Sequence, residues 1–246
     1  MDICDPRSIA RALKHHKPWA VINTAGFVRV ADAEREPDAC LAANADGAEA
    51  LARACAAAGV PLVTFSSDLV FDGRLGRRYH EEDETAPGCV YGVSKAEAER
   101  RVLAAGGKPL VVRTSAFFGP WDRYNFAWHV LSSLARGETV RACSRSRVSP
   151  TYVPDLCHAA LDLLIDGETG LWHLANDGEV SWHEFARRVA QGAGYDPALV
   201  IAEDGPEALS TALASKRGMM LRSFDEALED FLRSATIEEE TAVAAE

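Results

Sequence analysis

Apolar residues along this chain fall into short continuous runs that alternate with longer segments of helical spacing. A short apolar run bounded by turn residues is typical of a buried parallel strand, and four such runs occur, at 19–23, 61–67, 109–115 and 171–175. Segments with apolar residues three and four apart predict helices at 5–16, 38–58, 91–105, 126–135, 154–165, from 182 onwards, and at 224–232. Strands separated by helices predict a parallel sheet covered on both faces.

Helix start and stop residues support these boundaries. Asp5-Pro6 supplies an N-cap and a first-turn proline, and Ser181 with Glu184 has the spacing of a capping box. Gly59 ends the second helix, and Gly106-Gly107 ends the third. The sequence therefore predicts a Rossmann-like α/β fold followed by a smaller lobe.

The order of the predicted elements suggests a division of the chain. We expect a partial Rossmann-like domain over 1–120, mainly a smaller lobe over 121–235 with some return to the sheet, and an acidic tail over 236–246.

Composition narrows the function classes. The net charge of −11 over 246 residues argues against nucleic-acid binding. No uninterrupted apolar stretch is long enough to span a membrane, and the first residues lack a signal-peptide core, so we expect a cytoplasmic protein. The six cysteines and seven histidines form no C-x-x-C or H-E-x-x-H motif, which predicts reduced structural thiols and no metal site.

Polar residues stand where the predicted strands end. Asn23 to Gly26 follow the first strand, Ser66 to Asp68 follow the second, and Arg113 to Ser115 close the third. Ligands of open parallel sheets bind outside the carboxyl ends of the strands. The sequence predicts a ligand site at this edge.

Tyr91 and Lys95 are four residues apart on a predicted helix and share one face of it. Reduction of a ketone needs a proton donor for the developing alkoxide, and a nearby ammonium lowers the pKa of a phenol. A hydroxyl such as that of Ser67 can hold the carbonyl beside the phenol. Each feature alone also occurs as an accident of helix composition or as a turn residue, but their order at strand ends favours a reductase.

The sequence resembles the dTDP-4-dehydrorhamnose reductases, a family of the extended short-chain dehydrogenase/reductase superfamily. The similarity lies in SSDLVFDG (66–73), VYGVSKAEAE (90–99), VINTAGFVRVADAEREPDACLAANADG (21–47), VVRTSAFFG (111–119) and SPTYVPDL (149–156). It covers the chain to about Leu232. It implies reduction of the C4 ketone of a nucleotide-linked 4-keto-6-deoxysugar by NADPH or NADH, and a homodimer is an expectation from the family.

The resemblance also implies residue roles. The catalytic residues would be Ser67, Tyr91 and Lys95. The cofactor side would comprise Asn23, Ala25, Asn44, Tyr91, Lys95 and Arg113. The substrate side would comprise Asp68, Thr114, Asn125, Arg147 and Tyr152, with Arg145 and Arg147 near a diphosphate or on a solvated basic loop. Leu69 stands where the family has tyrosine, Ser67 stands where it has threonine, and GPWDRYNF is unusual, so the sugar stays open.

One family motif has no counterpart in this sequence. No G-x-G-x-x-G or G-x-x-G-x-x-G follows a predicted strand, although such a loop would hold the cofactor phosphates at a helix N-terminus. We expect weak or no cofactor binding by this chain alone. Three explanations stay open: the chain is one piece of a longer polypeptide, a partner segment supplies the missing strands, or the protein is a non-catalytic sugar-nucleotide-binding or regulatory subunit.

Overall fold

A computed structural model describes residues 1–205, 208–218 and 221–235. The predicted acidic tail at 236–246 lies outside these residues. Within the described part of the chain, no helix is long and apolar enough to cross a membrane.

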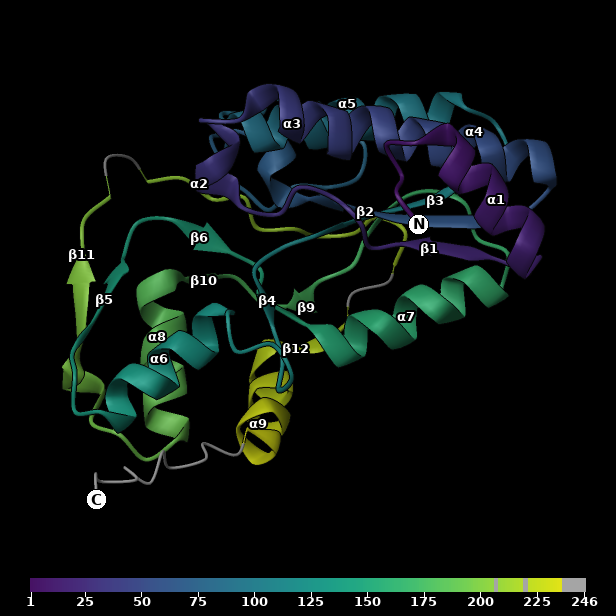
Figure 1. Ribbon diagram of the computed structural model, residues 1–246. Helices are drawn as coiled ribbons and strands as arrows, with labels where there is room; N and C mark the ends of the chain where they lie inside the picture. Colours follow the sequence, from purple (N-terminus) through teal and green to yellow (C-terminus); the bar gives the residue numbers. More distant parts are fainter. Residues whose placement is uncertain (206–207, 219–220, 236–246) are drawn as a thin grey trace, which may run out of the picture.

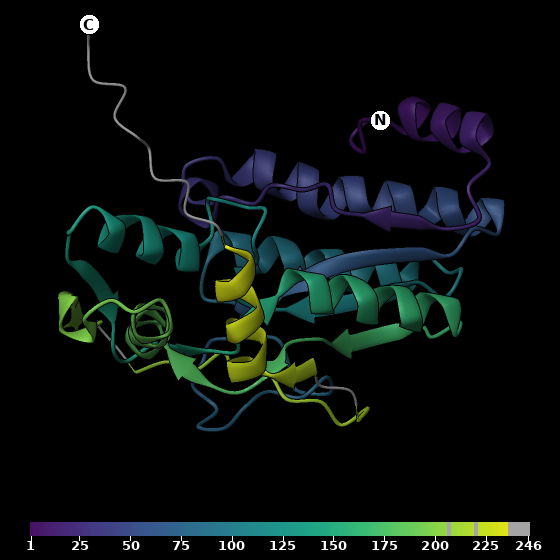
Figure 2. The same cartoon turned by 90° about the horizontal axis from the view of Figure 1, so that it is seen from below.

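A four-stranded parallel sheet forms the centre of the larger part of the molecule, between two sets of helices. Its strands run in the order β1-β2-β3-β8. They are β1 (Val21–Asn23), β2 (Leu62–Ser67), β3 (Leu110–Thr114) and β8 (Gly170–His173). These are the four apolar runs of the sequence, so the prediction of a parallel α/β sheet is confirmed. In Figure 2 the strands step from the β1 side, where α1 lies, toward β8.

Helices cover both faces of this sheet (Figure 1). One face carries α1 (Pro6–His16), α3 (Pro37–Leu41), α4 (Ala48–Ala58) and α5 (Val90–Ala104), and the other carries α7 (Val153–Ile165). Strand residues alternate between the two cores: Val111 packs with the α4 and α5 side chains, whereas Leu110 and Val112 pack with those of α7.

The helix that the sequence predicts over 38–58 is divided. The π-helical turn Ala42–Gly47 separates α3 from α4, and the short α2 (Val30–Ala33) precedes them. π-Helical turns are rare and occur frequently at functional sites. The wider turn carries Asn44, whose contacts are described with the site.

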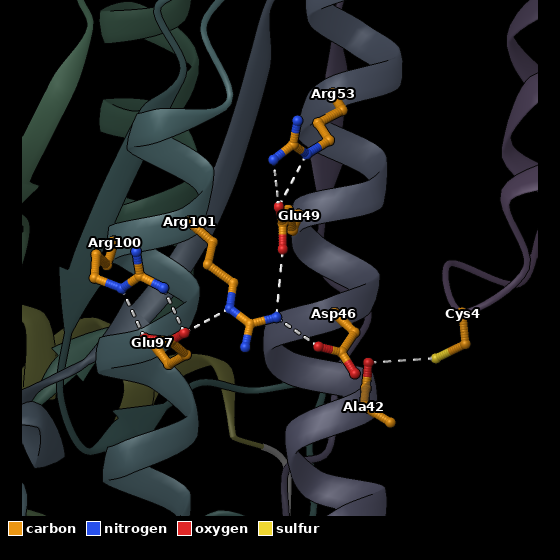
Figure 3. A network of polar contacts seen from close by, with 8 residues as sticks. All are labelled: Cys4, Ala42, Asp46, Glu49, Arg53, Glu97, Arg100 and Arg101. Atoms are coloured by element: carbon orange, nitrogen blue, oxygen red, sulfur yellow. Dashed lines mark hydrogen bonds and ion pairs between the residues drawn. The ribbon is translucent and has the colours of Figure 1, made fainter.

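Charged side chains join α4 to α5 on the outer surface (Figure 3). Arg101 donates to Glu97 on its own helix and to Asp46 and Glu49 across the gap. Arg53 adds a further bond to Glu49. Exposed ion pairs of this kind stabilise by about 0–1 kcal/mol each, so the network orients the two helices more than it stabilises the fold.

A second hydrophobic core lies between α6 (Phe126–Ala135), α8 (Trp182–Gly192) and α9 (Phe224–Ser234). Phe118 is its centre and contacts the rings of Phe185, Phe224 and Phe231. Short strands surround this core: β4 (Phe117–Phe118), β5 (Val140–Cys143), β6 (Arg147–Val148), β7 (Thr151–Tyr152), β9 (Asn176–Asp177), β10 (Val180–Ser181), β11 (Val200–Glu203) and β12 (Leu221–Ser223). The sequence does not predict them because most are too short to show a period. The division near residue 120 stays a prediction.

Only half of the predicted capping box forms at α8. The Ser181 hydroxyl accepts a hydrogen bond from the Glu184 amide, but the Glu184 carboxylate pairs with Arg188. The complete capping box lies at α9, between Ser223 and Glu226. A nearby arginine therefore outcompetes the cap at α8.

Candidate active site

A cavity of about 510 Å³ opens at the carboxyl ends of β2 and β3, where the sequence predicts the ligand site. Its polar wall comprises Ser66, Ser67, Asp68, Tyr91, Thr114, Ser115, Ser146, Arg147 and Thr211. Its apolar wall comprises Val28, Val30, Leu69, Ala116, Phe117, Val148, Trp182 and Leu209. A mostly apolar pocket with a few convergent polar groups is the usual form of a small-molecule site.

The start of α5 places Tyr91 in this cavity. The Cys89 thiol caps the helix by accepting from the Gly92 amide, and the Val90 amide donates to Glu34. A Cβ at Gly92 would lie 2.1 Å from the Leu69 carbonyl oxygen, so only glycine permits this approach. The glycine therefore brings Tyr91 up to the turn that follows Ser67.

Tyr91 and Lys95 lie together, as their spacing predicts. The Lys95 ammonium donates to the Phe65 carbonyl at 3.1 Å and lies 5.7 Å from the centre of the Tyr91 ring. Burial lowers the pKa of Lys95. Burial, reinforced by the charge of Asp68, raises the pKa of Tyr91, which is opposite to the lowering that the sequence predicts. Desolvation outweighs the ammonium here, so the phenol carries its proton at neutral pH.

Ser67 and Asp68 form the turn at the end of β2. The Ser67 hydroxyl accepts from the Leu69 amide at 3.1 Å and donates to the Asp68 carboxylate at 3.1 Å. Asp68 is 5 % exposed, and its burial raises its pKa against the opposing effect of hydroxyl donors. The serine hydroxyl is thus oriented by its neighbour.

The predicted cofactor residues Asn23, Ala25 and Asn44 lie in, or bond to, the segment that follows β1. The Asn23 side chain bonds to Thr64 and accepts from the Ala25 amide. The Asn44 side chain accepts from the Phe27 amide at 2.8 Å and donates to its carbonyl at 3.1 Å. These bonds hold the segment after β1 in place, although none of the three residues lines the cavity.

Arg113 does not reach the cavity. Its guanidinium forms a buried ion pair with Glu99 at 2.6 Å, and its Nη1 lies 3.3 Å from His173 Nε2. Strand alternation turns Arg113 toward α5, where Glu99 lies, and Thr114 toward the other face of the sheet, and the role of Arg113 beside the cofactor stays a prediction. Thr114 does line the cavity, and among the described residues its buried Oγ1 has no hydrogen-bond partner.

Of the other predicted substrate residues, some line the cavity and others do not. Arg147 lines the cavity but pairs with Glu179 at 3.0 Å, and Arg145 is exposed. Asn125 instead caps α6 and bonds to the Gly119 carbonyl, and Tyr152 packs on Phe118 in the second core. Neither of these two lines the cavity, because each is used by the lobe's own structure.

Several cavity residues are missing from the predicted set. Ser115 is the last residue of the predicted strand 109–115 and belongs to the strand-end residues that predict the ligand site, although no role was assigned to it. Trp182, Leu209 and Thr211 come from a helix start and a distant loop, and no local pattern marks them. Among the described residues, no group of three or more histidine, cysteine or acidic side chains could hold a metal ion.

Fold and cavity define a Rossmann-like α/β protein with serine, tyrosine and lysine at the carboxyl edge of its sheet. The profile of the RmlD substrate binding domain matches residues 1–235, and the chain belongs to this family. The resemblance found in the sequence is thereby confirmed.

Named relatives agree with this assignment. A dTDP-4-dehydrorhamnose reductase of Mycobacterium tuberculosis (strain ATCC 25618 / H37Rv) is 41% identical over 202 residues, which is 80% of this chain and 66% of the relative. One of Streptomyces griseus is 34% identical, covering 81% of this chain and 67% of the relative. The chain thus spans about two thirds of the length of these curated relatives.

A solved structure extends the likeness to the fold. The crystal structure of the dTDP-4-dehydrorhamnose reductase of Bacillus anthracis str. Ames, in complex with NADP, superposes with a TM-score of 0.89 at 28% identity. The match covers 96% of this chain and 87% of the other.

Proposed function

We propose that this chain reduces the C4 ketone of a nucleotide-linked 4-keto-6-deoxysugar with NADPH or NADH. One observation carries the proposal: Ser67 and Tyr91 face one cavity, and Lys95 lies behind Tyr91 on the same helix. The relatives are dTDP-4-dehydrorhamnose reductases, and the Bacillus anthracis structure contains NADP, which supports the proposal.

The residues near Lys95 fit the nicotinamide end of such a cofactor. Gly26 permits the close approach of Asn44 beside Lys95, since a Cβ at position 26 would lie 2.6 Å from Asn44 Oδ1 and 3.8 Å from Lys95 Nζ. Lys95 would bind the ribose hydroxyls, and Asn23 and Ala25 would hold the loop beside it. When bound, the reduced cofactor supplies the hydride that the ketone carbon accepts.

Tyr91 then gives its phenol proton to the ketone oxygen as negative charge develops there. Its raised pKa keeps that proton in place until an alkoxide, a stronger base, forms beside it. Ser67 positions the carbonyl once its proton, which points to Asp68 in the structure, turns to the ketone oxygen. The unpartnered Thr114 hydroxyl supplies a hydrogen bond to the sugar. Arg147 would reach a diphosphate from the cavity wall, sharing its charge with Glu179.

Two proposals concern partners. Within the described residues β1 pairs on one side only, with β2, and Ile22 on it is 44% exposed. We propose that a partner segment supplies a further strand at this edge or, as the alternative, that the protein is a homodimer. Light scattering tests the second proposal, which a mass of one chain would contradict.

The test of catalysis is Tyr91→Phe, which removes only the phenol oxygen. We expect turnover of the keto sugar to fall by at least about 100-fold, because a general acid contributes that much or more. Tyr124→Phe is the matched control, since Tyr124 is 99% exposed. Cofactor binding, followed by NADPH fluorescence, should be the same in Tyr124→Phe and the parent protein, and NADPH at saturation should not restore turnover in Tyr91→Phe.

Two outcomes would overturn the proposal. Equal turnover in Tyr91→Phe and the parent protein would exclude Tyr91 as the proton donor. A folded parent protein that binds the nucleotide sugar but shows no turnover at saturating NADPH would assign the chain to the non-catalytic alternative.

A further inference from the structure

Residues 208–217 lie along the cavity although they are far from its other residues in sequence. The Arg147 amide donates to the Leu209 carbonyl at 2.8 Å, and the Thr211 amide donates to the Arg147 carbonyl at 3.1 Å. On the other side, the Tyr79 amide donates to the Ala212 carbonyl at 2.8 Å. The backbone of this segment is therefore held between β6 and the loop near Tyr79, and Leu209 and Thr211 line the cavity.

The Thr211 hydroxyl meets the buried carboxylate of Asp68. It donates to Oδ2 at 2.5 Å, and the Ser115 hydroxyl donates to the same oxygen at 2.8 Å. The other oxygen, Oδ1, accepts from Ser67 at 3.1 Å. Hydroxyls from three separate parts of the chain thus surround a carboxylate that is 5 % exposed.

This arrangement decides where the Ser67 hydroxyl points. Its oxygen accepts from the Leu69 amide, and its single proton is directed to Asp68. The direction of that proton depends on the position of the carboxylate, which Thr211 and Ser115 hold from the far side. Removing one donor leaves the carboxylate free to turn.

We propose that Thr211 is a positioning residue of this cavity: its hydroxyl fixes the Asp68 carboxylate, and Asp68 in turn orients the Ser67 hydroxyl. The proposal deepens the proposed function and rests on it where turnover is concerned. The part of the proposal in which Thr211 fixes the Asp68 carboxylate does not depend on the proposed function.

Several charged or titratable groups lie around Asp68. Tyr91 of α5 and Arg147 of β6 line the same cavity, and Lys95 lies beside the Tyr91 ring. Burial raises the pKa of Asp68, and the three hydroxyl donors oppose this by stabilising the carboxylate. Loss of the Thr211 donor should therefore raise the pKa of Asp68 further.

The experiment compares Thr211→Val, which keeps the shape without the hydroxyl, with Thr211→Ser, which restores it. Asp68 is followed by carboxyl-carbon NMR titration of aspartate-labelled protein, with its signal assigned from Asp68→Asn. We expect its pKa to rise in Thr211→Val and to return to the parent value in Thr211→Ser. Turnover should fall about tenfold in the valine variant. The acid limb of the pH profile of turnover should move to higher pH.

Ser215→Ala is the control for a purely structural role. Ser215 anchors the same segment through Glu81 at 2.5 Å and does not line the cavity. An unchanged Asp68 titration in Thr211→Val, or an equal change in Ser215→Ala, would overturn the proposal. If the titration moves as expected while the parent protein shows no turnover, the positioning role holds and the proposed function fails.

Discussion

At the scale of single residues, the site depends on close approaches that only small side chains allow. Gly92 is the clearest case, since the Leu69 carbonyl occupies the space of its Cβ. The contact sets the distance between α5 and the turn at Asp68–Val70, and so between Tyr91 and Ser67. In the sequence Val90-Tyr91-Gly92, the glycine is therefore required for packing, and it holds the neighbouring tyrosine at the cavity.

We predict that Gly92→Ala displaces the start of α5. Overpacking of this kind costs about 1–3 kcal/mol, so the urea midpoint should fall, and turnover should fall with it because Tyr91 moves. Gly88→Ala is the matched control, because a Cβ there meets nothing within 4 Å. Equal stability and activity in the two variants would show that the approach at Gly92 is not limiting.

At the scale of elements, the π-helical turn Ala42–Gly47 links the segment after β1 to α5. Its Asn44 pairs with both backbone groups of Phe27 and donates to the Ser94 hydroxyl at 2.9 Å. Ser94 in turn donates to the Tyr91 carbonyl at 2.7 Å. One side chain therefore couples the segment after β1 to the helix that carries Tyr91 and Lys95.

We predict that Asn44→Ala loosens this segment while the sheet stays intact. The half-buried amide and carbonyl of Phe27 lose their partner, and each of these hydrogen bonds contributes about 0.5–1.5 kcal/mol. Hydrogen exchange should accelerate at Phe27 and its neighbours and stay slow in β2 and β3. Uniform acceleration across the sheet would instead mean that Asn44 stabilises the whole domain.

At the scale of the whole molecule, a buried polar network joins the sheet to the loops that flank the cavity. His173 of β8 donates through Nδ1 to the Ala214 carbonyl at 2.9 Å, so its Nε2 faces Arg113 as an acceptor. Its amide donates to Glu81, which also accepts from Ser215. The segment that carries Thr211 is thereby tied to the core of the sheet.

This network makes stability depend on pH. Burial, with the charge of Arg113, lowers the pKa of His173 to about 4. Because the unfolded chain binds this proton near pH 6.5, its contribution to stability is complete above that pH and is lost as the pH falls toward 4. The loss is on the order of 3 kcal/mol.

We predict that His173→Gln removes this part of the acid sensitivity. Urea unfolding at pH 7 and at pH 4 should show a smaller fall in the variant than in the parent protein, since other carboxyl groups titrate in both. His158→Gln is the control, because His158 is exposed on α7. An equal fall in all three proteins would show that His173 titrates normally.

The local signals in the sequence determined much of this protein. The apolar runs, the helical spacing and the capping residues predicted the sheet and its helices. The four-residue spacing of Tyr91 and Lys95 predicted that both lie on one helix face. All of these signals lie within a few neighbouring residues, so the sequence alone shows them. The position of Ser67 and Thr114 at strand ends was also visible, since parallel strands end at one edge.

Only the tertiary structure decided the rest. Arg113 turned away from the cavity because a buried carboxylate, Glu99, faces it from α5. Thr211 entered the cavity from the far end of the chain, where no period or motif marks it. Burial reversed the expected direction of the Tyr91 pKa, since desolvation depends on all the atoms packed around a group and not on its neighbours in sequence.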